Sequence, residues 1–579
     1  MSVKTPRQTV KPKPPPEPLR QPMSTGRKWA IGCAAALAAA MIVYWPALTG
    51  GFVFDDVHMH FLLPHPEKLT LWQWIRGARP LTDFSYWVNY KLDGTQPFGY
   101  HLVNLLLHVF TSLLVFLISG KILEMAAVEK RRRWLTAGFC GAIFLLHPLQ
   151  TEAVAYVAQR AECLSVALAF AAWTLFLYRP ENAIGWRTTA GVLLLFGASV
   201  GAKEHVAVLP LVILVTDYYW NPGFSLAGVR RNWRLYVPFL AGILAVAAFL
   251  YTYLAHEPTV GFHMKEFTWY QYLFTQCRVL FLYLRLFFLP VGQSADYFIA
   301  LSRTPLEHGA IIGMLALAAT TVAAIVWRKR FPIASYGFFV ALIFFLPTSS
   351  IMPVKDLATE RRLYLPMIGL LLMTAEAVVR VKWAERQLAG VLAAIVVMAG
   401  VMTWNRSQVW NNSLALWTDT VEKSPEKARA HFGLGVADYN AGRYEDAVRQ
   451  YALVKGPEYA NDGGFYSNWA LALTNAGHFE QAIQIARKSV QLSPTAANYA
   501  QLAECLVFAG QAQPALEMLD RAEKVDSGYE PLYIMRGDIL KELGPKDAAC
   551  AAFRKAQSLD PNDSSAAKGL AMTGCAAAH

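Results

Sequence analysis

The sequence predicts an all-α protein, a polytopic bundle of transmembrane helices followed by a soluble α-solenoid of repeated helix pairs. The first observation is composition, because the 579-residue chain is 55% hydrophobic but only 16% charged, whereas soluble domains carry about 25% charged residues. The second is a series of apolar runs suited to a bilayer, and the third is a repeat of about 34 residues near the C-terminus. This composition excludes a soluble globular enzyme and a disordered chain.

The chain begins with a basic, proline-rich arm. Residues 1–28 hold seven Lys or Arg side chains against one acid, Glu17, and so polar a stretch buries too little apolar surface to fold alone. An apolar run over 29–48 follows, a pattern typical of a signal peptide or a signal anchor. The run is long enough to span, and more spans follow. These features favour an anchor, with a disordered arm in the cytoplasm.

Twelve apolar runs lie in residues 29–404, the predicted transmembrane domain, whose first outer loop is 49–98. The runs are 29–48, 99–120, 134–147, 160–178, 188–202, 205–220, 235–255, 270–289, 309–327, 333–350, 363–380 and 387–404. Basic short loops mark the cytoplasmic side, and they agree with a cytoplasmic N-terminus only if one run does not cross. The run 270–289 is the weakest, since Arg278 and Arg285 interrupt it. We therefore predict about eleven spans, with the C-terminal repeats outside; twelve would place them in the cytoplasm.

Residues 405–579 have the composition of a soluble domain, with 17 basic and 20 acidic side chains. Four glycines recur there at intervals of 35, 33 and 34 residues, at Gly442, Gly477, Gly510 and Gly544. A small residue stands seven positions before each and an alanine five after. This pattern is typical of tetratricopeptide (TPR) repeats, paired helices that cross closely. We predict about four repeats after a half-repeat at 413–427, with a concave face for peptides; a plain scaffold and a non-repetitive helical domain are the alternatives.

The first outer loop carries two adjacent carboxylates, Asp55 and Asp56, directly after a predicted span. Such a pair suits general-base catalysis or metal coordination, and a solvated or helix-capping pair is the alternative. His58 and His60 follow, and we interpret them as packed or solvated residues rather than ligands. Arg79 begins a second polar segment of this loop, where a guanidinium has the geometry to pair with phosphate.

Three further polar clusters stand beside predicted spans, where ionisable side chains are costly. They are His147 to Glu152 with Arg160 and Glu162, then Lys203-Glu204-His205, then Lys355, Asp356, Glu360, Arg361 and Arg362. With eleven spans all three lie on the outer side, as does Asp55. Together they predict a site for a membrane-embedded anion such as a lipid-linked phosphate. Structural ion pairs between helices are the alternative, and His101 and His108 are interpreted as core residues.

Nearly the whole chain after residue 29 resembles the transmembrane-and-tetratricopeptide (TMTC-like) O-mannosyltransferase family of the GT-C glycosyltransferase superfamily. The resemblance rests on short segments in order, followed by the repeats. The segments are GFVFDD at 51–56, RPLT at 79–82, PFGYHLVN at 97–104, HPLQTEAV at 147–154, AKE at 202–204, LP at 289–290 with ADY at 295–297, and ERRLYLP at 360–366. Each segment is weak alone, and their order and junction with the repeats make the set specific.

The resemblance implies a GT-C-type bundle and an enzyme that moves a sugar from a polyprenyl-phosphate donor to a protein Ser or Thr hydroxyl outside the cytoplasm, with inversion. It implies that Asp55 is the general base, that Asp56 orients the acceptor or holds a metal, and that Glu204 is a second acid in the cavity. The residues implied to neutralise the donor phosphate are Arg79, Lys203, Arg361 and Arg362. The family pattern has one arginine before Leu-Tyr-Leu-Pro and this chain has two, so which of them binds phosphate stays open. A divalent metal, Mg²⁺ or Mn²⁺, also stays open because superfamily members differ in metal use.

The implied partners are the polyprenyl-phosphate-linked sugar, an acceptor protein bound by the TPR domain, and membrane lipid. The net charge of +12 does not indicate nucleic acid, because much of it lies in the N-terminal arm and in loops that set membrane orientation. Compact loops favour a bacterial inner membrane, with the repeats in the periplasm, over an endoplasmic reticulum membrane. The alternative function is a non-catalytic membrane scaffold or lipid transporter with a repeat domain, which leaves the Asp pair and the outer arginines without a role.

Overall fold

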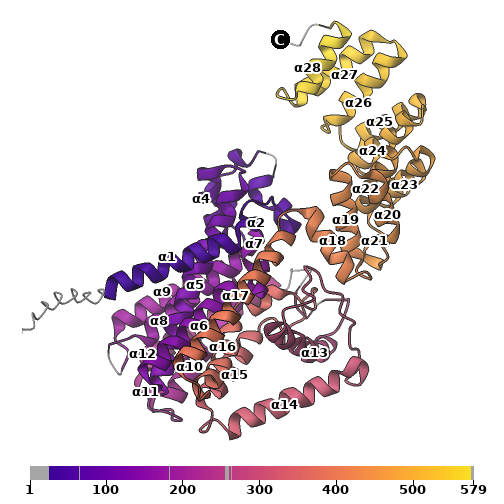
Figure 1. The fold of residues 1–579 in the computed structure, drawn as a ribbon. Helices are drawn as coiled ribbons and strands as arrows, with labels where there is room; N and C mark the ends of the chain where they lie inside the picture. The colour runs from indigo at the N-terminus through magenta and orange to yellow at the C-terminus, as the bar shows by residue number, and fades with distance from the viewer. Residues whose placement is uncertain (1–24, 64, 181–182, 255–259, 263, 576–579) are drawn as a thin grey trace, which may run out of the picture.

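The computed structural model describes residues 25–63, 65–180, 183–254, 260–262 and 264–575, and these form helices and loops with one isolated bridge between Val260 and Val354. The predicted all-α class is confirmed. Figure 1 shows a bundle that contains the N-terminal helix and a column of repeat helices that leads away from it to the C-terminus. Of the predicted arm, residues 1–24 lie outside the described residues, and 25–28 begin the first helix.

The helices before the repeats are α1 (Thr25–Val43), α2 (Trp45–Leu48), α3 (Leu71–Ile75), α4 (Pro80–Asp93), α5 (Pro97–Met125), α6 (Lys130–Leu146), α7 (Thr151–Ala155), α8 (Arg160–Leu177), α9 (Trp186–Ala202), α10 (Leu209–Trp220), α11 (Ala227–Arg231), α12 (Trp233–Leu254), α13 (Trp269–Phe288), α14 (Ala310–Val326), α15 (Pro332–Phe345), α16 (Met367–Arg380) and α17 (Glu385–Val409). Short 3-10 helices join them at η1 (Phe54–His58), η2 (His60–Leu62), η3 (Pro66–Lys68), η4 (Pro148–Gln150), η5 (Val157–Gln159), η6 (Glu204–Val208), η7 (Glu307–Gly309) and η8 (Glu360–Leu363). Each predicted apolar run coincides with one of these helices or with a neighbouring pair.

Four helical segments among the described residues are long and apolar enough to cross a membrane. They are Pro97–Met125, Val157–Leu177, Glu307–Val326 and Glu385–Val409, and Trp29–Val43 and Pro332–Phe345 are shorter apolar helices. The chain therefore has the helices of a multi-pass membrane protein. The larger number of about eleven crossings stays a prediction.

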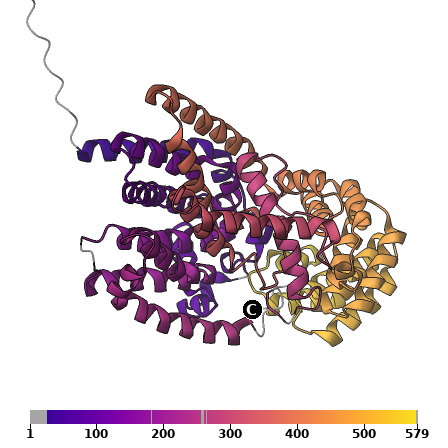
Figure 2. The same ribbon diagram turned by 90° about the horizontal axis from the view of Figure 1, so that it is seen from below.

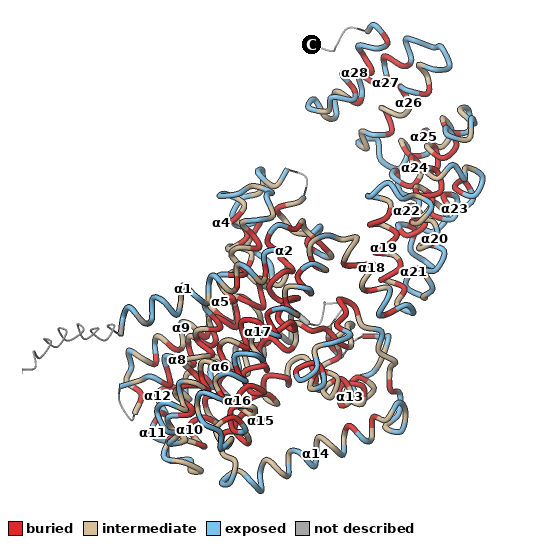
Figure 3. The backbone as a smooth tube through the Cα atoms, in the orientation of Figure 1, coloured by how far each residue is buried: buried red, intermediate tan, exposed pale blue. Residues whose placement is uncertain are grey.

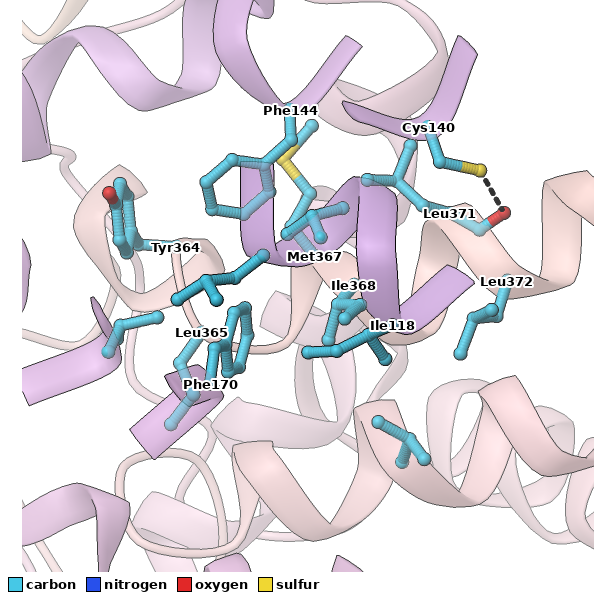
Figure 4. Packing of buried hydrophobic residues seen from close by; sticks show 14 of the residues in the cluster. Ile118, Cys140, Phe144, Phe170, Tyr364, Leu365, Met367, Ile368, Leu371 and Leu372 are labelled. Carbon is cyan, nitrogen blue, oxygen red and sulfur yellow. Dashed lines mark hydrogen bonds between the residues drawn. The ribbon is translucent and has the colours of Figure 1, made fainter. Parts of the chain in front are cut away.

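The core of the bundle surrounds the start of α16. Figure 4 shows Leu365, Met367 and Ile368 among side chains of α5, α6 and α8, including Phe144 and Phe170. On the other side α15 comes very close, because the backbone of its glycine faces a glycine of α16 without a Cβ between them. Small residues allow such close helix crossings in membranes. This packing fixes α16, and with it the polar segment 360–366 that leads into it.

The helix α14 lies outside this core, whereas the second half of α13 contributes Val279, Tyr283, Leu286 and Phe287 to it. Figures 1 and 2 show both helices to one side of the bundle, and Figure 3 shows mostly intermediate and exposed residues along α14. Only 11% of the apolar window of Glu307–Val326 is buried within the protein. An apolar helix with so little protein cover has its surface available to lipid.

The repeat region follows with α18 (Ser413–Lys423), α19 (Ala428–Asn440), α20 (Tyr444–Leu453), α21 (Pro457–Ala460), α22 (Gly463–Asn475), α23 (Phe479–Leu492), α24 (Ala496–Phe508), α25 (Ala512–Val525), α26 (Pro531–Leu543), α27 (Lys546–Leu559) and α28 (Ser564–Thr573). The four periodic glycines join the two helices of each pair with φ between 74° and 101°, a left-handed conformation that other residues rarely adopt. Each of the four alanines five positions later is buried. The predicted TPR architecture is confirmed.

The C-terminal end of the described chain carries a covalent link. Cys550 of α27 and Cys575 form a disulfide across the last helix pair, with their Cα atoms 6.0 Å apart. It ties the C-terminal end of the described chain to the repeat before it.

Candidate functional site

The two adjacent carboxylates of the first outer loop have different surroundings. Asp56 is completely buried in η1, where its Oδ1 accepts the backbone N–H of Ala158 at 2.7 Å and its Oδ2 that of Val53 at 3.1 Å. Burial raises the pKa of Asp56 to about 7, although these N–H groups favour its charged form. Asp56 therefore fastens the loop to the segment before α8.

Asp55 lies on the outer face of the same turn with its side chain exposed. Its backbone N–H donates to the phenol oxygen of buried Tyr156 at 3.1 Å. Burial, together with the nearby charges of Asp55 and Asp56, raises the pKa of Tyr156 well above its usual value. The carboxylate of Asp55 is thus exposed on a turn that the hydrogen bonds of Asp56 hold in place.

The metal role that was left open for this pair does not fit the geometry. Both oxygens of Asp56 already accept backbone hydrogen bonds. Across the part of the chain that the structure describes, no three His, Cys, Asp or Glu side chains are grouped as metal ligands. Mg²⁺ and Mn²⁺ need several oxygen ligands around one centre, so the residues present do not form such a site.

Arg361 stands at the centre of a charged cluster. Its Nη1 lies 2.5 Å from Oε1 of buried Glu152 in α7, and its backbone N–H donates to Oε2 of the same carboxylate at 2.9 Å. A second carboxylate, Asp356, lies 3.4 Å from Nη2. Burial alone would raise the pKa of Asp356, but arginines that include Arg361 lower it to about 2. Arg429 of α19 contacts both Asp356 and the Phe54 ring next to Asp55, so this cluster lies near the turn that carries Asp55.

Arg362 has uncharged hydrogen-bond partners. Its Nη1 donates to the phenol oxygen of Tyr272 in α13 at 3.2 Å and to the carbonyl of Leu357 at 3.3 Å, and its Nη2 donates to the carbonyl of Asp356. The two adjacent arginines therefore differ: carboxylates neutralise the guanidinium of Arg361, whereas that of Arg362 is held by dipoles.

The remaining predicted residues form two ion pairs near α9. Arg79 donates to both oxygens of Glu204, at 2.9 and 3.2 Å, with about two fifths of each side chain exposed. Although burial acts to raise it, Arg79 lowers the pKa of Glu204 to about 2. Lys203 donates at 2.7 Å to Glu162, which also pairs with His205 at 2.9 Å and is almost fully buried. In the structure, Arg79, Lys203 and Glu204 therefore form structural ion pairs, which was the alternative to a phosphate-binding role.

The two carboxylates near α9 are expected to differ sharply in their contribution to stability. Glu162→Gln leaves Lys203 without its buried counter-charge and should destabilise the fold by about 3–5 kcal/mol. Glu204→Gln breaks a half-exposed pair worth about 0–1 kcal/mol. Thermal unfolding of both variants in detergent would show this difference, and equal midpoints would contradict it.

Several residues of the site were not singled out from the sequence. They are Tyr156 beneath Asp55, Asp296, and Trp417 and Arg429 of the repeats. Arg429 donates to Asp296 through two nitrogens and also reaches Asp356. No sequence signal separates Arg429 from the other basic residues of a soluble repeat. The predicted core roles of His101 and His108 agree with their burial, and His108 lies between Tyr364 and the carbonyl of Leu145.

Comparison with solved structures and family models concerns the repeats. The peptide-binding TPR protein YrrB aligns with 31% of this chain and 88% of its own length at 16% identity and a TM-score of 0.24. The TPR protein TTC0263 of Thermus thermophilus aligns with 31% of this chain and 95% of its own length at 18% identity and a TM-score of 0.25. A tetratricopeptide-repeat family model matches residues 530–563.

Comparison with curated proteins covers most of the chain. The protein O-mannosyl-transferase F38B6.6 of Caenorhabditis elegans is 26% identical over 76% of this chain and 65% of its own length. The human protein O-mannosyl-transferase TMTC3 is 24% identical over 90% of this chain and 63% of its own length, and the Drosophila melanogaster Tmtc3 is 24% identical over 87% and 65%. This chain thus spans somewhat less than two thirds of the length of these three relatives. Over most of its length the chain is similar to TMTC protein O-mannosyl-transferases, as the resemblance implied.

Proposed function

We propose that this chain is a membrane glycosyltransferase that transfers a sugar from a polyprenyl-phosphate donor to Ser or Thr hydroxyls of extracytoplasmic proteins. The observation that carries the proposal is the contact made by Arg429, which lies over the Phe54 ring next to exposed Asp55 and also reaches Asp356. Asp356 belongs to the cluster that holds Arg361 and Arg362. The names of the relatives point to mannose as the sugar and to protein as the acceptor.

In the proposed reaction Asp55 accepts the proton of the acceptor hydroxyl as its oxygen attacks the anomeric carbon. The bond between this carbon and the phosphate oxygen breaks, and the polyprenyl phosphate leaves with the electron pair. Attack from the face opposite the phosphate inverts the anomeric centre. Asp56 contributes by holding the loop, and cationic side chains stabilise the negative charge that develops on the leaving group.

Of the two adjacent arginines, Arg362 is the better candidate for the donor phosphate. Glu152 and Asp356 already neutralise Arg361, whereas the hydrogen bonds of Arg362 go to a phenol and two carbonyls. An arginine held by dipoles keeps a positive charge for a phosphate ligand. Arg79 and Lys203 form the ion pairs described above, and we assign them a supporting role in the electrostatics of the cavity.

An apolar cavity near the segment that precedes Arg362 has room for a short part of the donor's lipid. It has a volume of about 110 Å³ and lies between α13, α14, α15 and α16, with Leu280, Tyr283, Leu317, Phe338 and Leu370 among its lining residues. The phenol of Tyr283 accepts the backbone N–H of Thr359 at 3.1 Å, three residues before Arg362. A short isoprenoid segment in this cavity would lie against Tyr283, whose phenol is bonded to the segment that precedes Arg362.

The repeat region offers a groove for an acceptor protein. A cavity of about 600 Å³ lies between α24 and α26, lined by exposed apolar side chains such as Phe508 and Leu543. Its charged lining residues are Glu504, Glu530, Asp538, Glu542 and Asp563. This lining is complementary to an acceptor segment that carries both aliphatic and basic side chains.

We place the repeats outside the cytoplasm, with eleven crossings and with α13 as the run that does not cross. The first half of α13 is bonded to outer-loop segments, since Tyr272 donates to the carbonyl of Thr348 and Gln276 to that of Leu357. The disulfide at Cys550 also suits an oxidising compartment. These features favour a bacterial inner membrane with periplasmic repeats, and the disulfide is equally compatible with the endoplasmic reticulum lumen.

The proposed transfer can be tested with the purified full-length protein in liposomes. Polyprenyl-phosphate mannose and a Ser/Thr-containing peptide should give a hexose-modified peptide, detected by mass spectrometry. In cells, loss of this chain should remove a hexose modification from extracytoplasmic proteins. Movement of the donor across the liposome membrane with no modified peptide would instead support a lipid transporter.

A further inference from the structure

The residue before Asp55 has an unusual backbone conformation. Phe54 has φ of 58°, in the left-handed region that a bulky residue adopts only when surrounding contacts impose it. This conformation turns the chain so that Asp55 lies outward while Asp56 lies inward. The contacts that hold Phe54 therefore decide where the exposed carboxylate lies.

These contacts come largely from the repeat region. The Phe54 ring stacks on Trp417 of α18 with centroids 5.1 Å apart, and the guanidinium of Arg429 in α19 lies 5.4 Å from its centroid. Tyr156 of the membrane bundle completes the surround, edge-on at 5.5 Å. Trp417 is itself packed against Gly433, where a Cβ would lie only 2.3 Å from the indole. Phe54 thus packs, partly buried, against the cluster that α18 of the half-repeat forms with α19 of the first repeat.

Arg429 is anchored to the loops that hold the charged cluster. Its Nε and Nη2 lie 2.6 and 2.7 Å from the two oxygens of buried Asp296, and its Nη2 lies 2.8 Å from Asp356. Lys427 adds a contact to Asp296 at 3.3 Å. The Asp356 carboxylate that Arg429 reaches also contacts Arg361. One side chain of the repeats therefore touches both the Asp55 loop and the arginine cluster.

The start of the same loop is fixed independently. The backbone N–H of Gly51 donates to the carbonyl of Asn411 at 2.9 Å, and the Asn411 side chain donates to the carbonyl of Pro46 at 2.6 Å. A Cβ on Gly50 would lie 2.5 Å from the same Asn411 carbonyl. The loop is therefore held by the chain between α17 and α18 at its base and by α18 and α19 at Phe54.

We infer that α18 and α19 are an integral part of the catalytic centre, in which Trp417 and Arg429 are positioning residues that hold Phe54 and thereby orient Asp55. The inference rests on the proposed function and deepens it, since the first repeat would then be needed for transfer to every acceptor. The more distal repeats would serve only acceptors that reach them. A misplacement of about 1 Å at a reacting group can cost about 10²-fold in rate. Greater mobility of Phe54 should therefore lower kcat.

The test compares Arg429→Met and Trp417→Leu with the wild-type full-length protein in liposomes. With a short peptide acceptor, each variant should lose about 10- to 100-fold in kcat, with KM for the lipid donor unchanged, and Arg429→Lys should recover part of the loss. The matched control is Arg536→Met, which removes a similar Arg–carboxylate pair from the last repeats and should leave short-peptide transfer unchanged. Normal kcat on short peptides, with losses only on protein acceptors, would overturn the inference.

Hydrogen exchange of loop 50–58 separates this inference from the proposed function. In Arg429→Met and Trp417→Leu the backbone N–H of Asp55, which is bonded to Tyr156, should exchange faster than in the wild type and in Arg536→Met. Unchanged exchange would show that the repeats do not hold the loop, whatever the enzyme's activity. Faster exchange in a protein with no transferase activity would retain the contact and reject the proposed reaction.

Discussion

Asp55→Asn is expected to abolish sugar transfer while the protein stays folded and inserted in the membrane. The substitution removes the proton acceptor but keeps the backbone N–H that donates to Tyr156, so the loop should keep its conformation. Loss of a general base typically costs about 10²–10⁴-fold in rate. Turnover of donor and short peptide in liposomes would measure the loss, with thermal unfolding as the check on folding.

The matched control for this experiment is Glu67→Gln in the same outer loop. Glu67 is exposed and pairs with His65, which is also exposed, so its neutralisation should leave both turnover and unfolding unchanged. Near-normal turnover of Asp55→Asn would remove Asp55 from the mechanism. Equal losses in both variants would point to the overall charge of the loop instead.

Arg362→Met is expected to lower turnover of the lipid donor, whereas Arg361→Met is expected to lower the stability of the protein. Removing Arg362 takes away the proposed donor to the leaving phosphate and should lower kcat/KM for the lipid donor by about 10²–10³-fold, as for the loss of one oxyanion donor. Removing Arg361 leaves Glu152 buried without its counter-charge and should destabilise the protein by about 3–5 kcal/mol. Donor titrations and thermal unfolding of both variants distinguish the two effects.

Arg278→Met provides the comparison for Arg362, because Arg278 of α13 also donates to uncharged oxygens, those of Ala300 and Ser302 at 2.9 Å. It should retain donor kinetics close to the wild type. The opposite result would be a stable Arg361→Met that loses only donor turnover, together with a fully active Arg362→Met. It would assign the donor phosphate to Arg361 instead of Arg362.

Much of the fold follows from local patterns. Each predicted apolar run coincides with helix, because a continuous apolar stretch of this length satisfies its backbone internally wherever it packs. The periodic glycines from Gly442 to Gly544 predicted the helix-pair turns because a positive φ is a local requirement that glycine meets best. The number of membrane crossings did not follow in this way. Among the described residues, length and hydropathy mark four helices that are long and apolar enough to cross a membrane, and they do not decide whether the shorter apolar helices cross.

In the candidate site, too, some features followed from local sequence and others depended on the tertiary structure. By itself, the sequence determined that carboxylates and arginines gather beside the spans, because hydropathy makes each such residue conspicuous where it stands. Only the tertiary structure decided their partners: Glu152 meets Arg361 across 209 residues of chain, Asp55 meets Tyr156 across 101, and Arg429 of the repeats meets Asp296 across 133. Such pairings depend on how helices distant in the chain pack together, and no local pattern of residue types encodes that packing.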